Sequence, residues 1–331
     1  MKIIYVERAV QDHPRTQRIL ARYPAADVII CEHYKAVFNP KSQSFRQQKQ
    51  LGPALILAEK KGRRVMPAPP GFGIGHQHNY YFSHLLNCPY DCRYCFLQGM
   101  YPSANWVLFV NFEDFMQEIQ DVVKSHQGES CVFFSGYDCD SLAMDGLTQF
   151  VSEFMPFFAQ LPQATLELRS KSTQVRGLLS MEPIANAVVA YSLMPDAVAK
   201  RVEHKAPSVE KRLQAIEKLV AAGWQLGVRF DPLIQVRDFE VLYQQLIARL
   251  KTIIPPEQLH SVSVGALRFP NKMLDRLQGL YPEDPLLLYP FEQKKGVSSY
   301  PESIEQGLKG SVQAMVEEWV GSDKIFSCEA A

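Results

Sequence analysis

The chain has 331 residues, of which 47% are hydrophobic, so it can bury a large core without disulfide bonds. Its 35 basic and 35 acidic residues cancel, which excludes a uniformly basic chain, so any nucleic-acid surface must be local. The opening MKIIYVERAV lacks the apolar core of a signal peptide, and no later run reaches transmembrane length. We therefore expect a cytoplasmic protein with no membrane partner, whose seven cysteines are reduced.

The first 73 residues are predicted to form a small α/β region. Strand-like runs cover residues 2–6 (KIIYV) and 26–32 (ADVIICE), and two apolar runs around EKKGRR at 59–64 resemble a hairpin. Pro and Gly residues at 67–73 mark the seam with the main domain. Between Lys41 and Arg64 the basic residues face a single acidic one, Glu59, which indicates either a solvated surface or an auxiliary DNA contact.

Beyond this seam, strands and helices alternate. The predicted strands are 106–110, 130–136, 165–171, 186–193 and 225–230, and the predicted helices are 111–126, 145–161, 173–181 and 208–223. In the last helix, Ser208 is placed to cap the start and Gly223 to end it. Repeated βα units of this length predict an α/β fold with a parallel sheet, either open or closed into a partial barrel. Chemistry in such folds lies at the carboxyl ends of the strands.

A loop that follows the strand-like NYYFSHLLN contains three cysteines within eight residues, in the sequence NCPYDCRYCFLQG. Cys88, Cys92 and Cys95 are spaced C-x3-C-x2-C. A structural zinc site needs four closed ligands, whereas a four-iron cluster on three cysteines leaves one iron open to another ligand. We therefore favour a cluster. The alternatives are three small core residues, or a zinc site that takes its remaining ligand from a nearby side chain: His76, His78, His84 or Cys139.

With Tyr94 directly before the last cysteine, this loop resembles the signature of the radical S-adenosylmethionine enzymes. The wider sequence resembles one branch of them, the spore photoproduct lyase family. The resemblance covers most of the chain in colinear order, and the segments that carry it are YVERAVQDHPRTQ, NCPYDCRYCFLQGMYPSANWVLFVNFEDF, DSLAMDGLT, LELRSKSTQV, AYSLMP, AAGWQLGVRFDPL and LRFPNKMLDRLQGLYPED.

The resemblance implies a partial (β/α)6 radical-SAM barrel over residues 71–262, with an N-terminal region at 1–70 and a C-terminal substrate-binding extension at 263–331. It implies a [4Fe-4S] cluster on Cys88, Cys92 and Cys95, with S-adenosylmethionine chelating the fourth iron. The expected activity is that of a lyase that repairs a methylene-bridged thymine dimer, the spore photoproduct, in DNA. Hydrogen abstraction by a 5'-deoxyadenosyl radical starts the repair. An electron donor such as flavodoxin or ferredoxin is the expected protein partner.

Several positions are implied to bind S-adenosylmethionine by their match to the family. Ser135 and Gly136 fall beside the methionine moiety, and Lys171 and Ser192 match cofactor contacts; Tyr94 completes this set from within the cysteine loop. An ammonium suits a carboxylate, and a hydroxyl can hold a ribose or an amine. Without the resemblance, Lys171 would be a solvated surface lysine and Ser192 a strand-end hydroxyl.

Two catalytic positions depart from the family. Where the lyase has a cysteine that returns a hydrogen atom to the product, this chain has Tyr137, with Cys139 two residues along. The relay tyrosine after the third cluster cysteine is Phe96, which has no hydroxyl hydrogen to give. Either Cys139 and Tyr137 have exchanged roles, or the lesion chemistry is altered, or Cys139 packs as a small hydrophobe.

The expected nucleic-acid contacts lie near the C-terminus. Arg268 and Lys272 can face a backbone phosphate, and Lys294 and Lys295 lie within an aromatic and basic stretch at 289–303 that has no residue-by-residue match in the family. The tail is predicted to fray, leaving Cys328 exposed. Two alternatives stay open. One is hydrogen abstraction from a different substrate, such as another nucleic-acid base, and the other is a noncatalytic Fe-S or Zn module that binds nucleic acid.

Overall fold

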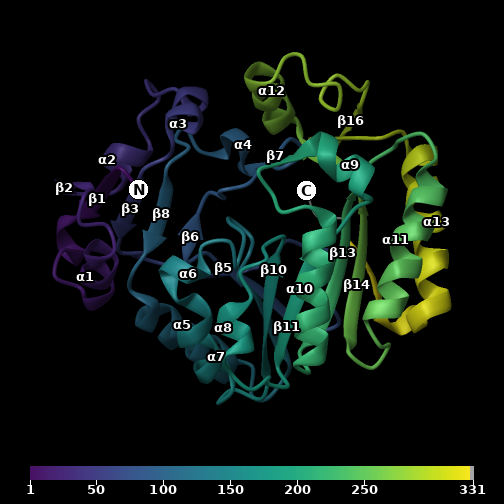
Figure 1. The fold of residues 1–331 in the computed structure, drawn as a ribbon, viewed down its shortest axis with the longest axis horizontal. Coiled ribbons are helices and arrows are strands. Elements are labelled where there is room, and N and C mark those ends of the chain that lie inside the picture. The colour runs from purple at the N-terminus through teal and green to yellow at the C-terminus, as the bar shows by residue number, and fades with distance from the viewer. Residues whose placement is uncertain (329–331) are drawn as a thin grey trace.

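Two β-sheets carry the fold of residues 1–328, the part of the chain that the computed structural model describes (Figure 1). Within these residues the larger sheet has eight strands. In spatial order they are β18 (Ile325–Ser327), β14 (Leu259–Ala266), β13 (Gln225–Leu233), β11 (Ala187–Ser192), β10 (Ala164–Ser170), β9 (Cys131–Phe134), β5 (His78–Phe82) and β4 (Val65–Pro67). Every neighbouring pair from β5 to β18 is parallel, and only β4 pairs antiparallel.

Helices follow the parallel strands and cover the outer side of the curled sheet, so both faces of its central strands are buried (Figure 1). They are α6 (Asp145–Thr148), α7 (Phe150–Phe158), α8 (Arg176–Leu179), α10 (Val209–Ala221), α11 (Phe239–Ile253) and α13 (Glu302–Val320), whereas α9 (Asp196–Val202) and α12 (Asn271–Leu280) lie at the ends of the strands (Figure 1). The prediction of a partial (β/α)6 barrel is confirmed, because six of the parallel strands, β5, β9, β10, β11, β13 and β14, alternate with helical segments within residues 78–280.

Helix α10 shows how the sequence produces one of these units. The Ser208 side chain accepts a hydrogen bond from the Lys211 amide at 3.4 Å and so caps the first turn. Its apolar stripe buries Leu213, Ile216 and Leu219 against the sheet. Gly223 follows with φ = 88°, a conformation that ends the helix at little steric cost. Both predicted helix boundaries are therefore confirmed.

The smaller sheet lies at the N-terminal side of the barrel (Figure 1). Its strands, in the order β2-β1-β3-β8-β6 within the described residues, are β2 (Asp27–Cys31), β1 (Ile3–Glu7), β3 (Leu55–Ala58), β8 (Trp106–Phe109) and β6 (Leu85–Leu86). The helical elements of this part are η1 (Arg8–Val10), α1 (Pro14–Ala21), α2 (Lys35–Phe38) and α3 (Phe45–Leu51), whereas α5 (Phe112–Ser125) lies beside α7 of the barrel (Figure 1). The buried Arg15 guanidinium links α1 to the barrel by ion pairs with Glu113 and Glu153.

The hairpin predicted around residues 59–64 is wrong. β3 pairs with β1 and β8 in the smaller sheet, whereas β4 pairs with β5 in the larger one. Side chains from elsewhere accept the backbone hydrogen bonds of the connecting segment: Glu7 from the Glu59 amide at 2.9 Å, and Glu118 from the Val65 amide at 3.0 Å. The strand predicted at 106–110 exists as β8 but joins the smaller sheet, because its apolar pattern does not encode which sheet it enters.

Hydrogen-bonded pairing crosses both boundaries expected from the sequence. β8 lies beyond residue 70 and pairs with β3 on one side and with β6 on the other, and β18 at the C-terminal end pairs with β14. The division into 1–70, 71–262 and 263–331 stays a prediction. Among residues 1–328, no helix has the length and apolar character needed to cross a membrane.

Short elements close the carboxyl end of the barrel. They are β7 (Asp91–Cys92), α4 (Leu97–Met100), β12 (Glu203–His204), β15 (Arg268–Pro270), β16 (Glu292–Lys294) and β17 (Val297–Ser299). The short η2 (Ser322–Lys324) lies at the other end, where Lys324 donates to the Leu259 carbonyl at the start of β14. Figure 1 shows α12 and β16 above the strand ends, on the same side as α4, β7 and α9. The strand order and these closing elements together bring loops that are far apart in the sequence to one place.

Candidate active site

A cavity of about 390 Å³ opens at the carboxyl ends of the barrel strands, and we call it the mouth cavity. It is lined largely by apolar and aromatic side chains with a few polar groups, the usual character of a small-molecule site. Ten of the predicted site residues line it: Cys88, Cys92, Tyr94, Cys95, Gly136, Tyr137, Cys139, Lys171, Ser192 and Arg268. Four predicted residues lie outside its lining: Ser135, Lys272, Lys294 and Lys295.

The cysteine loop is held from both sides. Its β7 segment pairs antiparallel with β12, with Cys92 opposite Glu203, and the Arg93 amide donates to the Val202 carbonyl at 2.8 Å. On the other side, Lys49 donates to Asp91 at 2.8 Å and to Gln98 at 2.7 Å. These contacts fix the loop backbone, so the thiols keep one arrangement at the cavity.

All seven cysteines are free thiols, as expected for reduced cysteines. Burial raises the pKa of the Cys92 thiol to about 12, and it also raises the pKa values of Cys88 and Cys95. The thiols are therefore protonated when no metal is bound, and a soft metal must displace these protons to bind. Three thiols on one loop fit a cluster held by three cysteines.

The histidines considered for a zinc site do not join the cysteines. His76 contacts Thr165 at 2.9 Å, and His78 contacts Glu129 at 2.5 Å, and neither lines the mouth cavity. His84 is buried, with its ring stacked on Phe150 at 4.0 Å. Cys139 lines the cavity, but its Sγ lies 3.6 Å from the Ser135 carbonyl oxygen, to which it can donate. None of these three histidines therefore joins the thiols.

A buried carboxylate, Glu203, organises the polar side of the cavity. It accepts short hydrogen bonds from the Tyr94 hydroxyl and the Arg212 guanidinium, and the Lys171 ammonium lies 3.9 Å from it. Lys171 also lies 5.4 Å from the centroid of the Tyr94 ring. Arg212 donates to the Ser192 carbonyl at 3.2 Å, which ties the end of β11 to the same network. Lys171 is thereby a positioned cation and not a solvated one.

The sequence analysis did not identify Glu203 or Arg212. Glu203 lies outside the segments that resemble the family, and Arg212 lies in a helix whose pattern predicts only an apolar stripe. Both side chains are 1% exposed. One feature of the sequence could have indicated Arg212. It lies on the same side of α10 as the buried Leu213 and Ile216, and a charged side chain in such a position usually has a buried partner.

Gly136 forms part of the cavity wall as bare backbone. A Cβ atom at this position would lie 2.8 Å from both the Arg169 carbonyl oxygen and the Ser141 hydroxyl, so a side chain does not fit. The Ser135 hydroxyl donates to the Glu167 carbonyl at 3.0 Å and contacts the Ser141 hydroxyl at 2.9 Å. Ser135 therefore supports the loop from behind, and its side chain is not part of the cavity surface.

An aromatic cluster covers another side of the cavity. The Tyr137 ring stacks on Tyr81 with centroids 4.3 Å apart, and the rings of Phe72 and Phe96 lie 6.0 Å and 5.8 Å from it. Three of these rings, Phe72, Phe96 and Tyr137, line the cavity. Cys139 is 6% exposed and is packed in the main core. Tyr137 is the more accessible of the two predicted catalytic residues.

Two arginines bring positive charge to the cavity. Arg169 bonds to Glu167 at 3.0 Å and lies over the Phe72 ring at 4.8 Å, and Arg268 bonds to Asp231 at 3.1 Å. Below them, Arg229 and Glu167 form an ion pair in which both side chains are 0% exposed. Burial alone would raise the pKa of the Glu167 carboxyl, but the guanidinium groups of Arg229 and Arg169 lower it to about 2.

The expectation that Cys328 is exposed in a frayed tail is wrong. Cys328 is 6% exposed, and its amide donates to the Val264 carbonyl at 3.0 Å, directly after the pairing of β18 with β14. Its Sγ lies 3.1 Å from Arg268, which lines the cavity. The segment is ordered by its pairing with β14, a strand more than 60 residues earlier in the sequence. The composition of the tail does not encode this pairing.

The other predicted nucleic-acid residues lie on the surface of the C-terminal part. Lys272, Lys294 and Lys295 are exposed, and Lys294 pairs with Glu292 at 3.0 Å. The aromatic residues of this stretch pack on one another, as the 4.8 Å contact of Tyr289 with Tyr300 shows. In the basic stretch at 41–64, Lys49 and Arg64 pair with the carboxylates of Asp91 and Asp114, which reduces the net positive charge there.

The family model and the relatives that match this chain carry the same description. A family model described as spore photoproduct lyase matches residues 1–302. The spore photoproduct lyase of Bacillus subtilis (strain 168) is 21% identical, with 98% of this chain and 97% of that protein covered. The spore photoproduct lyase of Geobacillus sp. (strain Y412MC61) is 21% identical over 81% of this chain and 76% of that protein.

Solved structures have the same fold. A spore photoproduct lyase mutant with bound AdoMet and dinucleoside spore photoproduct superposes with a TM-score of 0.83 at 18% identity, covering 100% of this chain and 98% of that one. A spore photoproduct lyase complexed with dinucleoside spore photoproduct gives a TM-score of 0.83 at 18% identity, covering 98% and 97%.

Proposed function

Because this chain belongs to the spore photoproduct lyase family, we propose that it is a radical S-adenosylmethionine lyase that repairs the spore photoproduct, a methylene-bridged thymine dimer in DNA. One observation carries this function more than any other. The three thiols, the positioned Lys171 and the bare backbone of Gly136 line a single cavity at the carboxyl end of a parallel half-barrel. This is the end of the fold where loops bind cofactors and substrates.

Cys88, Cys92 and Cys95 would hold a [4Fe-4S] cluster, and the remaining lining would hold S-adenosylmethionine. When bound, this pair supplies a 5'-deoxyadenosyl radical that abstracts a hydrogen atom from the substrate. Lys171 offers an ammonium for the methionine carboxylate, and Glu203 keeps that ammonium in place. Gly136 lets the backbone approach the ligand closely, and Ser192 offers a hydroxyl at the end of β11. The apolar walls exclude water from the reacting atoms.

The lesion would enter beside Tyr137 and Phe72, where flat rings can stack on a thymine. Arg169 and Arg268 carry positive charge at the same wall, and we assign them to contacts with the phosphate or the base edges of the substrate. Lys272, Lys294 and Lys295 would add weaker, salt-dependent contacts to flanking DNA. Flavodoxin or ferredoxin would deliver the electron, and the reduced thiols are consistent with a cytoplasmic location.

The direct test is an anaerobic assay with the reconstituted protein, dithionite, S-adenosylmethionine and the dinucleotide spore photoproduct. We expect both 5'-deoxyadenosine and restored thymidylyl-thymidine by mass spectrometry. A matched control is Cys31→Ala, which removes a thiol in β2 that does not line the mouth cavity. If 5'-deoxyadenosine forms but no thymidylyl-thymidine is restored, either in the dinucleotide or in longer DNA, the proposed substrate is wrong. The assignment as a radical S-adenosylmethionine enzyme would still hold.

A second candidate function is radical chemistry on a different nucleic-acid substrate. The observation in its favour is the aromatic wall, since Tyr137 and Phe96 stand where the family has its donor cysteine and relay tyrosine. Both changes alter the hydrogen-bonding and redox character of the substrate side of the cavity. The same assay with other damaged oligonucleotides, scored by 5'-deoxyadenosine above the rate without substrate, separates this candidate from the first.

We further propose that Tyr137 supplies the hydrogen atom that completes the repair. The O–H bond of Tyr137 breaks as a C–H bond forms on the thymine, and the phenoxyl group then takes an electron from the reductant and a proton from water. Tyr137 lines the cavity and is stacked on a second phenol, Tyr81, whereas the Cys139 thiol is directed to the Ser135 carbonyl. This geometry favours Tyr137 over Cys139 as the donor.

Tyr137→Phe should leave cleavage of S-adenosylmethionine intact and reduce restored thymidylyl-thymidine at least tenfold, because the ring stays and only the hydroxyl hydrogen is lost. Cys139→Ala should change the product yield by less than twofold. In D2O the wild type should place one deuterium on the product thymine, and Tyr137→Phe should not. Equal yields from Tyr137→Phe and wild type, together with loss in Cys139→Ala, would transfer the donor role to Cys139.

A further inference from the structure

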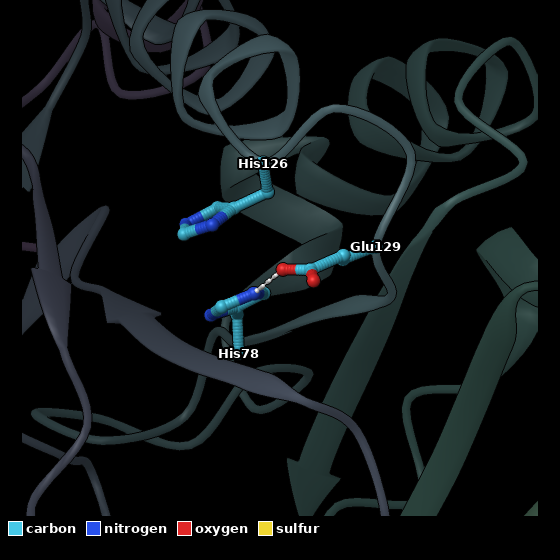
Figure 2. Close-up of side chains that lie close together, drawn as sticks. All are labelled: His78, His126 and Glu129. Atoms are coloured by element: carbon cyan, nitrogen blue, oxygen red, sulfur yellow. Dashed lines mark hydrogen bonds and ion pairs between the residues drawn. The ribbon is translucent and has the colours of Figure 1, made fainter.

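A cluster of two histidines and one glutamate lies at the opposite end of the barrel from the cysteines. His78 is the first residue of β5, His126 directly follows the last residue of α5, and Glu129 lies in the loop that leads into β9. Figure 2 shows the two imidazole rings one above the other, with the Glu129 carboxylate beside them. These residues do not line the mouth cavity and have no part in the chemistry proposed there.

The three side chains are already close enough to share an ion. One potential ligand atom from each lies within 4.8 Å of the others. The His78 Nε2 atom is 2.5 Å from Glu129 Oε2, and the His78 and His126 rings are stacked with centroids 3.6 Å apart (Figure 2). His78 is 28% exposed and Glu129 is 53% exposed, so an ion can reach them from solvent and the side chains can rotate.

The backbone around the cluster is fixed. The His78 amide donates to the Ser130 carbonyl at 3.1 Å, and the Ser130 amide donates to the Gln77 side chain at 3.1 Å, which locks the start of β5 to the loop before β9. The Glu129 amide donates to the His126 carbonyl at 3.0 Å across a tight turn. The turn contains Gly128 with φ = 96°, and it brings His126 and Glu129 to the same side.

Tyr80 orients the second histidine. Its hydroxyl is 2.6 Å from His126 Nε2, which leaves Nδ1 of that ring open to another ligand. A hydrogen bond to one ring nitrogen that fixes the orientation of a histidine is the usual support of a metal-binding imidazole. Two imidazoles and a carboxylate with open solvent positions also form a ligand set that binds Zn²⁺.

We propose that His78, His126 and Glu129 bind a divalent transition-metal ion, best Zn²⁺, as a clamp between β5, α5 and the loop before β9. The ion would replace the proton shared by His78 and Glu129. Nitrogen ligands favour Zn²⁺ over Mg²⁺ and Ca²⁺, which prefer sites made entirely of oxygen. Side-chain rotation closes the present spacing to the metal–ligand distances of about 2.0–2.2 Å that Zn²⁺ requires. The clamp would hold the first residue of the strand that leads toward the cysteine loop.

The test uses the holoprotein, in which the cluster already occupies the cysteine thiols. Calorimetric titration with ZnCl2 should show one additional Zn²⁺ per chain, and Zn²⁺ should raise the melting temperature. His78→Ala and Glu129→Gln should weaken this binding at least tenfold and remove the thermal shift. Glu129→Gln keeps the shape of an exposed side chain, so it tests the site without threatening the fold. The control is His33→Ala. His33 lies 3.9 Å from a carboxylate, Glu7, but this pair includes no second histidine. The His33→Ala variant should therefore bind Zn²⁺ as the wild type does.

Unchanged Zn²⁺ affinity in His78→Ala and Glu129→Gln, or no Zn²⁺ bound to the wild-type holoprotein, would overturn the proposal. Co²⁺ gives a second readout, because Co²⁺ on nitrogen and oxygen ligands lacks the thiolate charge-transfer bands that binding at the cysteines would produce. The test is independent of the proposed function: Cys88→Ala combined with Cys92→Ala and Cys95→Ala removes the cluster but should leave Zn²⁺ binding intact.

Discussion

Replacing Cys92 with alanine is expected to abolish both cluster binding and cleavage of S-adenosylmethionine. A four-iron cluster on three cysteines has no spare protein ligand, so the loss of one thiolate leaves two irons without a protein ligand. Cys92 is buried, and the residue opposite it in β12 is Glu203, a carboxylate already bonded to Tyr94 and Arg212. The measurements are iron and labile sulfide per chain after anaerobic reconstitution, and 5'-deoxyadenosine after reduction.

The matched control for Cys92→Ala is Cys31→Ala, which should retain the iron content and activity of the wild type. Cys31 lies in β2, at the edge of the smaller sheet, and does not line the mouth cavity. A Cys92→Ala protein that still cleaves S-adenosylmethionine would show that the cluster is not held by this loop. A wild-type protein that binds one Zn²⁺ but no iron after reconstitution, together with loss of that Zn²⁺ in Cys92→Ala, would favour the noncatalytic zinc alternative.

Removing the charge of Glu167 is expected to have the largest effect on stability. Glu167 and Arg229 form an ion pair with both side chains 0% exposed, at 2.8 Å. Glu167→Gln leaves the Arg229 guanidinium buried without a counter-charge, and breaking one partner of such a pair costs about 3–5 kcal/mol. Urea unfolding of the reduced apoprotein, followed by circular dichroism, measures the change in the free energy of unfolding.

An exposed ion pair of the same chain provides the comparison. Glu210 and Arg249 pair at 2.9 Å with both side chains 48% exposed, so Glu210→Gln should leave the free energy of unfolding nearly unchanged. If both variants unfold at the same urea concentration as the wild type, the buried pair does not stabilise the barrel. A loss in Glu167→Gln alone would support the assignment, because burial is the main difference between the two pairs.

The pH dependence of stability gives an independent check on Glu167. Its pKa is lowered to about 2 in the folded protein, compared with about 4.3 for an unfolded chain. A depressed carboxyl pKa stabilises the folded state fully above the unfolded value, and this contribution disappears as the pH falls from about 4.3 toward 2. Over this pH range, the free energy of unfolding of the Glu167→Gln variant should therefore fall less than that of the wild type.

The same ion pair connects stability to the site. Glu167 also bonds to Arg169 at 3.0 Å, and Arg169 lies over Phe72 at the cavity wall. The main-chain carbonyl of Glu167 accepts the Ser135 hydroxyl hydrogen bond. Glu167 thus supports the arginine proposed to contact the substrate through its carboxylate, and the loop that contains Gly136 through its main-chain carbonyl.

By itself, the sequence determined the elements that depend on local spacing. The C-x3-C-x2-C loop, the alternating strands and helices, and the ends of α10 at Ser208 and Gly223 all follow from residues within a few positions of one another. Because the βα units are short and regular, a parallel sheet with the cysteine loop at its carboxyl end could be predicted as well, and the family resemblance implied that this sheet forms a partial barrel.

Only the tertiary structure decided which distant residues meet. Glu203 and Arg212 reach Tyr94 and Lys171 through the pairing of β12 with β7, and Cys328 reaches Arg268 through the pairing of β18 with β14. The residues after β3 cross to the larger sheet because side chains far along the chain accept their backbone hydrogen bonds. Such contacts depend on long-range strand order and on the burial of charge, and neither leaves a periodic signal in the local sequence.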